Sequence, residues 1–242
     1  MDAWFDEWFD EDYATLYAHR DAAEAALAVK TALRHGPELA QGPVLDVACG
    51  SGRHLQALRK HNPEAFGLDL SSCLLGRAPE PLRPWLVRGD MRTLPVRPGC
   101  LAGITLWFTS FGFFPDAVNR RVLIDLRQLL RPGGVLLLDL FNPHRLVREL
   151  VAVEATEQPD LKVRTRRSLE DSRVVKRMTL IRESTGRSRE VVERVRIYPP
   201  DTLDGMAAEA GMVRSKTWGT YDGTPFQPDR SPRWIALYKV NP

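Results

Sequence analysis

Short apolar segments alternate with stretches of helical character through the first part of the chain. Each segment has the length of a strand. The five segments are 44–47, 65–68, 85–88, 101–106 and 135–139. Strands that alternate with helices predict a mostly parallel sheet. The 242 residues are expected to form a single domain, because a chain of this length can bury a full core.

The alternation ends after the fifth strand, where β-rich runs follow one another with the turn residues E-D-S and S-T-G between them. These runs are 162–169, 173–182 and 189–198. They predict an antiparallel β meander, inserted over residues 145–198. The remaining elements are a helix over 199–210 and strands over 213–219 and 234–240.

The N-terminal segment, residues 1–34, has a helical pattern from Trp4 to Leu33. Its aromatic residues recur on one helical face. They are Trp4, Phe5, Trp8, Phe9 and Tyr13. We expect this face either to pack against the edge of the sheet or to form part of a lid over a ligand site.

A glycine-rich turn follows the first strand, in the sequence D-x-A-C-G-S-G-R that begins at Asp46. Gly50 and Gly52 allow the backbone to approach a ligand, and the helix that follows offers free N–H groups. A dinucleotide fingerprint would need a third glycine where Leu55 stands, which disfavours a nicotinamide oxidoreductase. The P-loop pattern is absent from the sequence.

This turn resembles motif I of the class I S-adenosylmethionine-dependent methyltransferases. Further segments match the family in the same order: Asp69 after the second strand, G-D-M at 89–91, the fourth strand, and R-P-G-G at 131–134. The resemblance covers residues 40–142 strongly and 198–240 more weakly. Two departures are Ala48 in place of the first glycine of motif I, and the absence of an Asp at the start of the fourth strand.

The resemblance implies a seven-stranded Rossmann-like methyltransferase sheet, mostly parallel with an antiparallel last strand, and with the antiparallel β insertion after strand five. It implies S-adenosylmethionine as cofactor and S-adenosylhomocysteine as product. The activity implied is methyl transfer to a nitrogen or oxygen atom of a small-molecule acceptor. Two alternatives stay open: an RNA or protein methyltransferase that docks its acceptor on the insertion, and a non-catalytic scaffold that binds the cofactor.

Within the family, Asp69 corresponds to the acid that accepts both ribose hydroxyls, and Asp90 to the residue that binds the adenine amino group. The next residue, Met91, is expected to pack on the adenine ring. A Y-x-x-x-Y helix, here Tyr13 and Tyr17, covers the methionine end of the cofactor in many relatives. The remaining expected cofactor contacts are Asp46, Ala48, Cys49, Gly50, Gly52, Leu70 and Trp107.

The cofactor carries the reactive sulfonium, so the protein mainly has to orient a nucleophile, and a general base is optional. The catalytic residue stays unknown, with Tyr17 and His144 as candidates and His144 as the candidate base, while His54 is expected on a helix or loop surface. No metal site is expected. The three cysteines, Cys49, Cys73 and Cys100, lack metal-ligand spacing.

Charge is distributed unevenly along the chain. Residues 1–24 hold eight acids and one base (−7), and residues 161–196 hold twelve bases and five acids (+7). We therefore expect these two segments to lie on the same side of the molecule. Residues 161–196 contain no aromatic side chain on which bases could stack, so a nucleic-acid partner is not favoured.

We expect the insertion to shield the acceptor side of the cleft or to pair with a second copy of the chain in a homodimer. No apolar run approaches the roughly 20 residues that span a bilayer, so no membrane partner is expected. Three cysteines with no framework spacing favour a reducing, cytoplasmic location.

Overall fold

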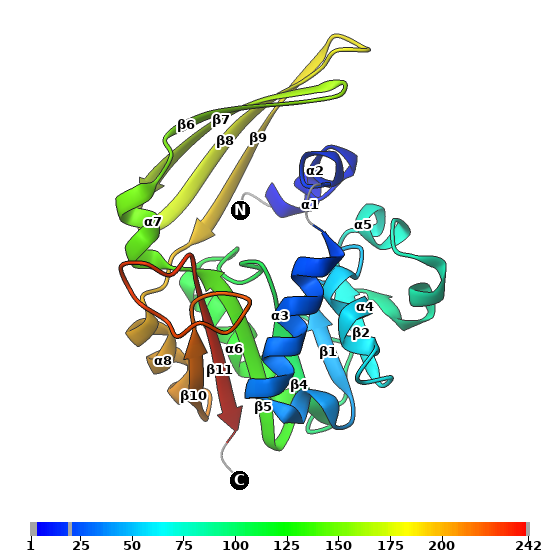
Figure 1. Ribbon diagram of the computed structural model, residues 1–242, viewed down its shortest axis with the longest axis vertical. Coiled ribbons are helices and arrows are strands. Elements are labelled where there is room, and N and C mark those ends of the chain that lie inside the picture. The colour runs from blue at the N-terminus through cyan, green and yellow to red at the C-terminus, as the bar shows by residue number, and fades with distance from the viewer. Residues whose placement is uncertain (1–3, 19–20, 241–242) are drawn as a thin grey trace.

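Seven strands form the main sheet of the described part of the chain, residues 4–18 and 21–240 of a computed structural model. They are β1 (Val44–Val47), β2 (Ala65–Asp69), β3 (Leu86–Arg88), β4 (Leu101–Leu106), β5 (Leu130–Phe141), β10 (Met212–Trp218) and β11 (Arg233–Val240). Their order is β10-β11-β5-β4-β1-β2-β3 (Figure 1). The first five strands pair in parallel, and β11 is antiparallel to both of its neighbours. The predicted methyltransferase-like sheet is confirmed.

Helices cover both faces of this sheet (Figure 1). The α-helices are α1 (Trp4–Trp8), α2 (Glu11–Leu16), α3 (Ala22–His35), α4 (Arg53–Arg59), α5 (Ser72–Gly76), α6 (Asp116–Leu129), α7 (Pro143–Glu149) and α8 (Pro200–Glu209), and the 3₁₀ helices are η1 (Pro37–Ala40) and η2 (Glu80–Trp85). Apolar residues of α3 and α4 pack in one core cluster, and those of α6 and α8 in another. The two clusters fix the sheet between two helical layers.

The N-terminal segment forms three helices where the hydrophobic pattern predicted one continuous helical stretch. Asp10 caps α2, with its side chain accepting from the N–H groups of Asp12 and Tyr13, and Asp21 caps α3. A side-chain oxygen that satisfies the first N–H groups of a helix starts a new helix there. Despite this break the aromatic residues still face the interior: Trp8, for example, is fully buried. Residues 1–3, 19 and 20 of this segment lie outside the described residues.

The insertion forms a second antiparallel sheet in the order β6-β7-β8-β9. Its strands are β6 (Val153–Gln158), β7 (Leu161–Glu170), β8 (Arg173–Arg182) and β9 (Arg187–Arg196). The sequence predicted three of them and missed β6, whose side chains are mostly exposed and carry little apolar alternation. The inserted region also begins with a helix, α7, capped by Asn142.

Helices α1 and α2 lie between the inserted sheet and the edge of the main sheet (Figure 1). Arg182 on β8 pairs with Asp12, and Arg189 on β9 pairs with Asp10 at 2.7 Å. The prediction that the acidic and basic segments lie on the same side is therefore confirmed. That the chain acts as one domain stays a prediction.

Candidate active site

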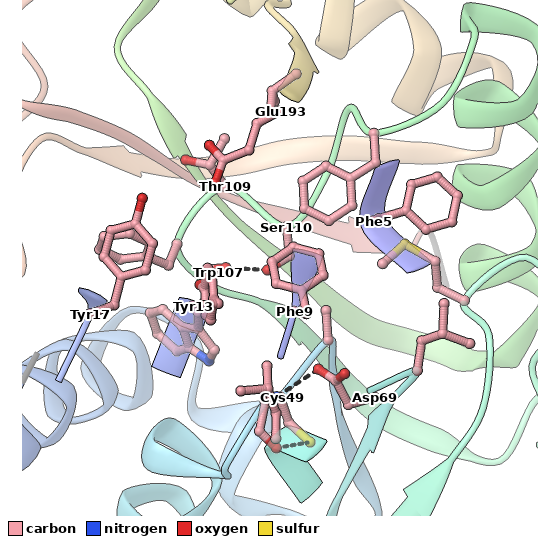
Figure 2. Close-up of a pocket in the computed structure, with 18 of the residues that line it drawn as sticks. Phe5, Phe9, Tyr13, Tyr17, Cys49, Asp69, Trp107, Thr109, Ser110 and Glu193 are labelled. Atoms are coloured by element: carbon pink, nitrogen blue, oxygen red, sulfur yellow. Dashed lines mark hydrogen bonds between the residues drawn. The ribbon is translucent and has the colours of Figure 1, made fainter. Parts of the chain in front are cut away.

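A cavity of about 700 Å³ lies between the carboxyl ends of the parallel strands and the inserted sheet. Its volume is in the range of small-ligand pockets, and its position is where open α/β sheets bind ligands. In the view of Figure 2, Cys49 and Asp69 lie at the bottom of the cavity and Glu193 at the top. The cavity thus has a wall of strand-end turns and a wall made by α1, α2 and the inserted sheet.

Nearly all of the predicted cofactor residues line this cavity, the exception being Gly52. Those that line it are Tyr13, Tyr17, Asp46, Ala48, Cys49, Gly50, Asp69, Leu70, Asp90, Met91 and Trp107. Gly52 instead closes the turn behind them: its φ is +80°, and a Cβ there would lie 2.3 Å from Leu82 Cδ2. Gly52 therefore serves local packing at the start of α4.

The turn between β1 and α4 is held in left-handed backbone conformations. Gly50 has φ +58°, and Ala48 has φ 56° although it carries a Cβ. A non-glycine residue pays a steric cost for this conformation. Ala48, which stands where the family has a glycine, therefore keeps the shape of the turn, but its backbone is strained.

Asp69, at the end of β2, ties two turns together. Its Oδ2 accepts from the Gly50 N–H at 2.7 Å and its Oδ1 accepts from the Ser71 N–H at 2.8 Å. Burial raises the pKa of Asp69, and the N–H groups of Ser71 and Gly50 counteract that effect. A carboxylate has about four acceptor sites, so these two bonds leave capacity for a ligand in the cavity.

Asp46, at the centre of the same wall, is fully buried. Its Oδ1 accepts from the Thr105 hydroxyl at 2.9 Å, while its Oδ2 has no hydrogen-bond partner among the described residues. Burial, together with the nearby Asp69 charge, raises the pKa of Asp46 to about 7. Burial also raises the pKa of the Cys49 thiol well above its usual range, which favours packing over nucleophilic chemistry there.

Asp90 and Met91 follow β3, and Asp90 is already engaged by Arg92. The Arg92 Nε donates to Asp90 Oδ2 at 2.9 Å, and its backbone N–H donates to Oδ1 at 2.8 Å. Burial would raise the pKa of Asp90, but the bonds from Arg92 hold it below its usual value. The Arg92 guanidinium also lies 5.4 Å from the Phe5 ring, which links this corner of the cavity to α1.

The loop after β4 is fixed by a buried network that the sequence analysis did not identify. Phe108 and Thr109 have φ 55° and 64°. Asp139 on β5 accepts the Phe108 N–H at 2.8 Å through Oδ2, and its carbonyl accepts the Thr109 N–H at 2.7 Å. Arg233 on β11 pairs with Asp139 at 2.5 Å, and the Tyr221 hydroxyl donates to the same carboxylate. Asp139 therefore holds two strained residues where they line the cavity.

The positions of His54 and His144 both differ from those expected from the sequence. His54 was expected on the surface, but it is buried, lines the cavity and stacks on Trp107 with ring centroids 4.7 Å apart. His54 lies four residues before the apolar Leu58, which is buried, and residues four apart share one face of a helix. This spacing could have indicated that His54 faces inward. His144 is exposed on α7 and is not among the residues that line the cavity. The structure therefore does not bring His144 together with the other predicted site residues.

Polar groups of the inserted sheet meet the N-terminal helices on the opposite wall. Lys176 on β8 donates to the Tyr17 hydroxyl and lies 3.8 Å from Glu193 on β9. The Trp8 indole N–H donates to Glu193 Oε1. Lys176 and Glu193 line the cavity and were missed, because nothing in a strand's own sequence shows which helix it will face.

The part of the chain that the structure describes shows neither a metal-binding cluster nor a membrane-spanning helix. No group of three or more His, Cys, Asp or Glu side chains there could hold a metal ion. No helix in those ranges has the length and apolar character needed to cross a membrane.

Comparison with known proteins supports the resemblance of the sequence. Residues 44–134 match the family described as a methyltransferase domain. A malonyl-[acyl-carrier protein] O-methyltransferase of Xylella fastidiosa (strain M23) is 36% identical over 110 residues, which are 43% of this chain and 36% of that protein. A dTDP-3-amino-3,6-dideoxy-alpha-D-glucopyranose N,N-dimethyltransferase of Streptomyces fradiae is 37% identical over 98 residues, 39% of this chain and 35% of that protein.

The chain therefore spans about a third of the length of these two relatives. A solved structure with a similar fold is the CcbJ methyltransferase of Streptomyces caelestis, with a TM-score of 0.79 at 19% identity. That likeness covers 98% of this chain and 99% of the other, and so includes the N-terminal helices and the inserted sheet.

Proposed function

We propose that this chain, which belongs to the class I S-adenosylmethionine-dependent methyltransferase family, transfers a methyl group to a nitrogen or oxygen atom of a small-molecule acceptor. The observation that carries the proposal is the single cavity wall on which Asp46, Gly50, Asp69 and Asp90 come together.

The chemistry of this wall fits the proposed cofactor. The unused acceptor capacity of Asp69 suits the ribose hydroxyls, and Asp90 with Met91 suits the adenine. Asp46 Oδ2, buried and without a hydrogen-bond partner among the described residues, suits the positive charge of the methionine end. When bound, S-adenosylmethionine supplies an electrophilic methyl group on a sulfonium.

The opposite wall would exclude water and hold the acceptor. Phe9 and Tyr13 line the cavity with their ring centroids 4.9 Å apart, and Phe9 also meets Phe113 of the loop after β4 at 5.9 Å. Aromatic faces attract a nearby cation, and a dry cavity strengthens the polar contacts within it. In this proposal α1 and α2 act as the lid over the methyl group.

The size and charge of the site support a small acceptor over RNA or a protein. Of the twelve basic residues in 161–196, at least seven already form ion pairs with carboxylates of this chain. They are Lys162, Arg167, Lys176, Arg177, Arg182, Arg189 and Arg196. Cations that are already paired are less able to neutralise phosphates and so to displace counterions from a nucleic acid, which weakens the case for a nucleic-acid surface. The names of the two relatives, one an N,N-dimethyltransferase and one an O-methyltransferase, keep both acceptor atoms in the proposal.

Calorimetric titration tests the cofactor, and transfer of a labelled methyl group tests the reaction. We expect the protein to bind S-adenosylmethionine and S-adenosylhomocysteine and not to bind NADH. We also expect it to transfer the labelled methyl group to components of a small-molecule filtrate of cell extract. A preference for NADH, or failure to bind S-adenosylmethionine, would contradict the proposed cofactor. Label found only in RNA or protein would contradict the small acceptor.

A further inference from the structure

Glu193 places a carboxylate on the acceptor side of an aromatic cavity. Its side chain is 17% exposed and lines the cavity from β9, across from the wall that holds Asp69 (Figure 2). A carboxylate in such a place must have its charge balanced and its oxygens bonded, or it destabilises the fold.

The two oxygens of Glu193 are used unequally. Oε1 accepts the indole N–H of Trp8, which holds the carboxylate in place against α1. The cationic partner of Oε2 is Lys176 Nζ at 3.8 Å, a distance that balances charge but exceeds a hydrogen bond. Oε2 therefore has room to accept a donor that enters the cavity.

The surroundings of Glu193 favour a donor that carries positive charge. The rings of Tyr13 and Tyr17 lie 4.7 Å apart in the same cavity. Aromatic faces and a carboxylate attract a cation, and a charge-assisted hydrogen bond is roughly twice as strong as a neutral one.

Two cations of the described inserted sheet line the cavity and could attract an anionic acceptor. Arg167 on β7 is paired with Glu154 at 2.6 Å. Lys176 on β8 is the other. It is only 10% exposed, donates to the Tyr17 hydroxyl and lies 5.1 Å from the Tyr17 ring. These contacts direct Lys176 toward the helix it supports. Glu193 is therefore the group better placed to bind an incoming molecule.

We propose that Glu193 recognises the acceptor and that the acceptor is an amine, bound as its ammonium form through an N–H donor to Oε2. The Glu193 carboxylate takes the proton that the ammonium must lose, which frees the nitrogen lone pair to accept the methyl group. This inference rests on the proposed methyltransferase function and narrows its acceptor from nitrogen or oxygen to nitrogen. An alcohol would offer Glu193 a neutral donor, and a carboxylate would be repelled by it.

Three probes that share a cyclohexyl ring test this inference on the 242-residue chain loaded with S-adenosylhomocysteine: cyclohexylamine, cyclohexanol and cyclohexanecarboxylate. We expect cyclohexylamine to bind at least about tenfold more tightly than either of the others, a difference of about 1.4 kcal/mol. Glu193→Gln keeps the shape and the Trp8 contact, and should abolish the preference. Glu190→Gln, an exposed position on the same strand, should retain it.

Equal binding of the three probes, tighter binding of the alcohol or carboxylate, or a preference that survives Glu193→Gln would each overturn the amine assignment. Each variant is first titrated with S-adenosylhomocysteine. If the native protein binds S-adenosylhomocysteine but shows no preference for the amine, the acceptor class is wrong and the methyltransferase proposal stands. If the native protein fails to bind S-adenosylhomocysteine, the proposed function itself fails.

Discussion

The two walls of the cavity are built by different physical means. The strand-end wall consists of backbone turns with positive φ at Ala48 and Gly50 and of buried carboxylates such as Asp69. The opposite wall consists of helices and strands that are far apart in sequence and are joined by ion pairs such as Asp12 with Arg182. The first wall depends on local chain geometry, while the second depends on which segments meet. Mutations should therefore affect the two walls to different degrees.

The largest effect is expected at Asp139, below the strand-end wall. Asp139→Ala leaves the buried Arg233 without its carboxylate and removes a bond that holds Phe108. Loss of one partner of a buried pair costs about 3–5 kcal/mol. Chemical denaturation should show this loss, with Glu209→Ala as the control. Glu209 pairs with Arg120 at the surface, where such pairs contribute about 0–1 kcal/mol. Equal losses in the two variants would contradict the proposed role of the network.

The next effect is expected on cofactor affinity. Asp69→Ala removes a charged acceptor and should weaken binding of S-adenosylmethionine by about 1.5–3 kcal/mol. Calorimetry measures the change, and Glu64→Ala, an exposed acid just before β2, serves as the control. Native affinity in the Asp69 variant would remove this residue from the proposed cofactor site.

A third effect is a dependence on pH that comes from Asp46. Its pKa is raised from 3.8 to about 7 in the folded chain, so its contribution to stability is full below about pH 4 and is lost as the pH rises toward 7. Relative to Asp46→Asn, the native protein should lose up to about 1.4 kcal/mol of unfolding free energy for each pH unit in that window. Affinity for the cationic cofactor should rise through about pH 7 in the native protein, as Asp46 ionises, and stay flat in the variant. Denaturation and calorimetry at several pH values measure both trends, and parallel curves for the two proteins would refute them.

The smallest effect is expected at the opposite wall. Arg182→Gln breaks a partly exposed pair with Asp12, and such pairs are worth about 0–1 kcal/mol. A double-mutant cycle with Asp12→Asn measures the coupling between helix α2 and the inserted sheet. A coupling above about 2 kcal/mol would show that ion pairs, rather than the buried Trp8, hold this wall together.

The same contrast explains what the sequence could predict. Asp46 lies within β1, Gly50 in the turn that follows it and Asp69 at the end of β2. The apolar pattern of both strands is clear, so the convergence of these residues at one sheet edge followed from the topology. The glycine-rich turn needed only a few adjacent residues to be recognised.

Features that depend on distant partners escaped prediction. Glu193 and Lys176 alternate with apolar residues as in any half-exposed strand, and only the position of α1 and α2 places them in the cavity. Strand β6 is held by its pairing with β7, and its own residues show no strong strand pattern. The break at Asp10 was missed because the aromatic spacing continues through it, although an aspartate is a strong capping residue.

The most direct test of the division between the two walls is a crystal structure with S-adenosylhomocysteine bound. We predict that the ribose hydroxyls contact Asp69, that the adenine lies against Asp90 and Met91, and that the sulfur faces the wall that holds Tyr17 and Glu193. A cofactor bound on the inserted sheet, or an adenosine placed away from Asp69, would contradict the division.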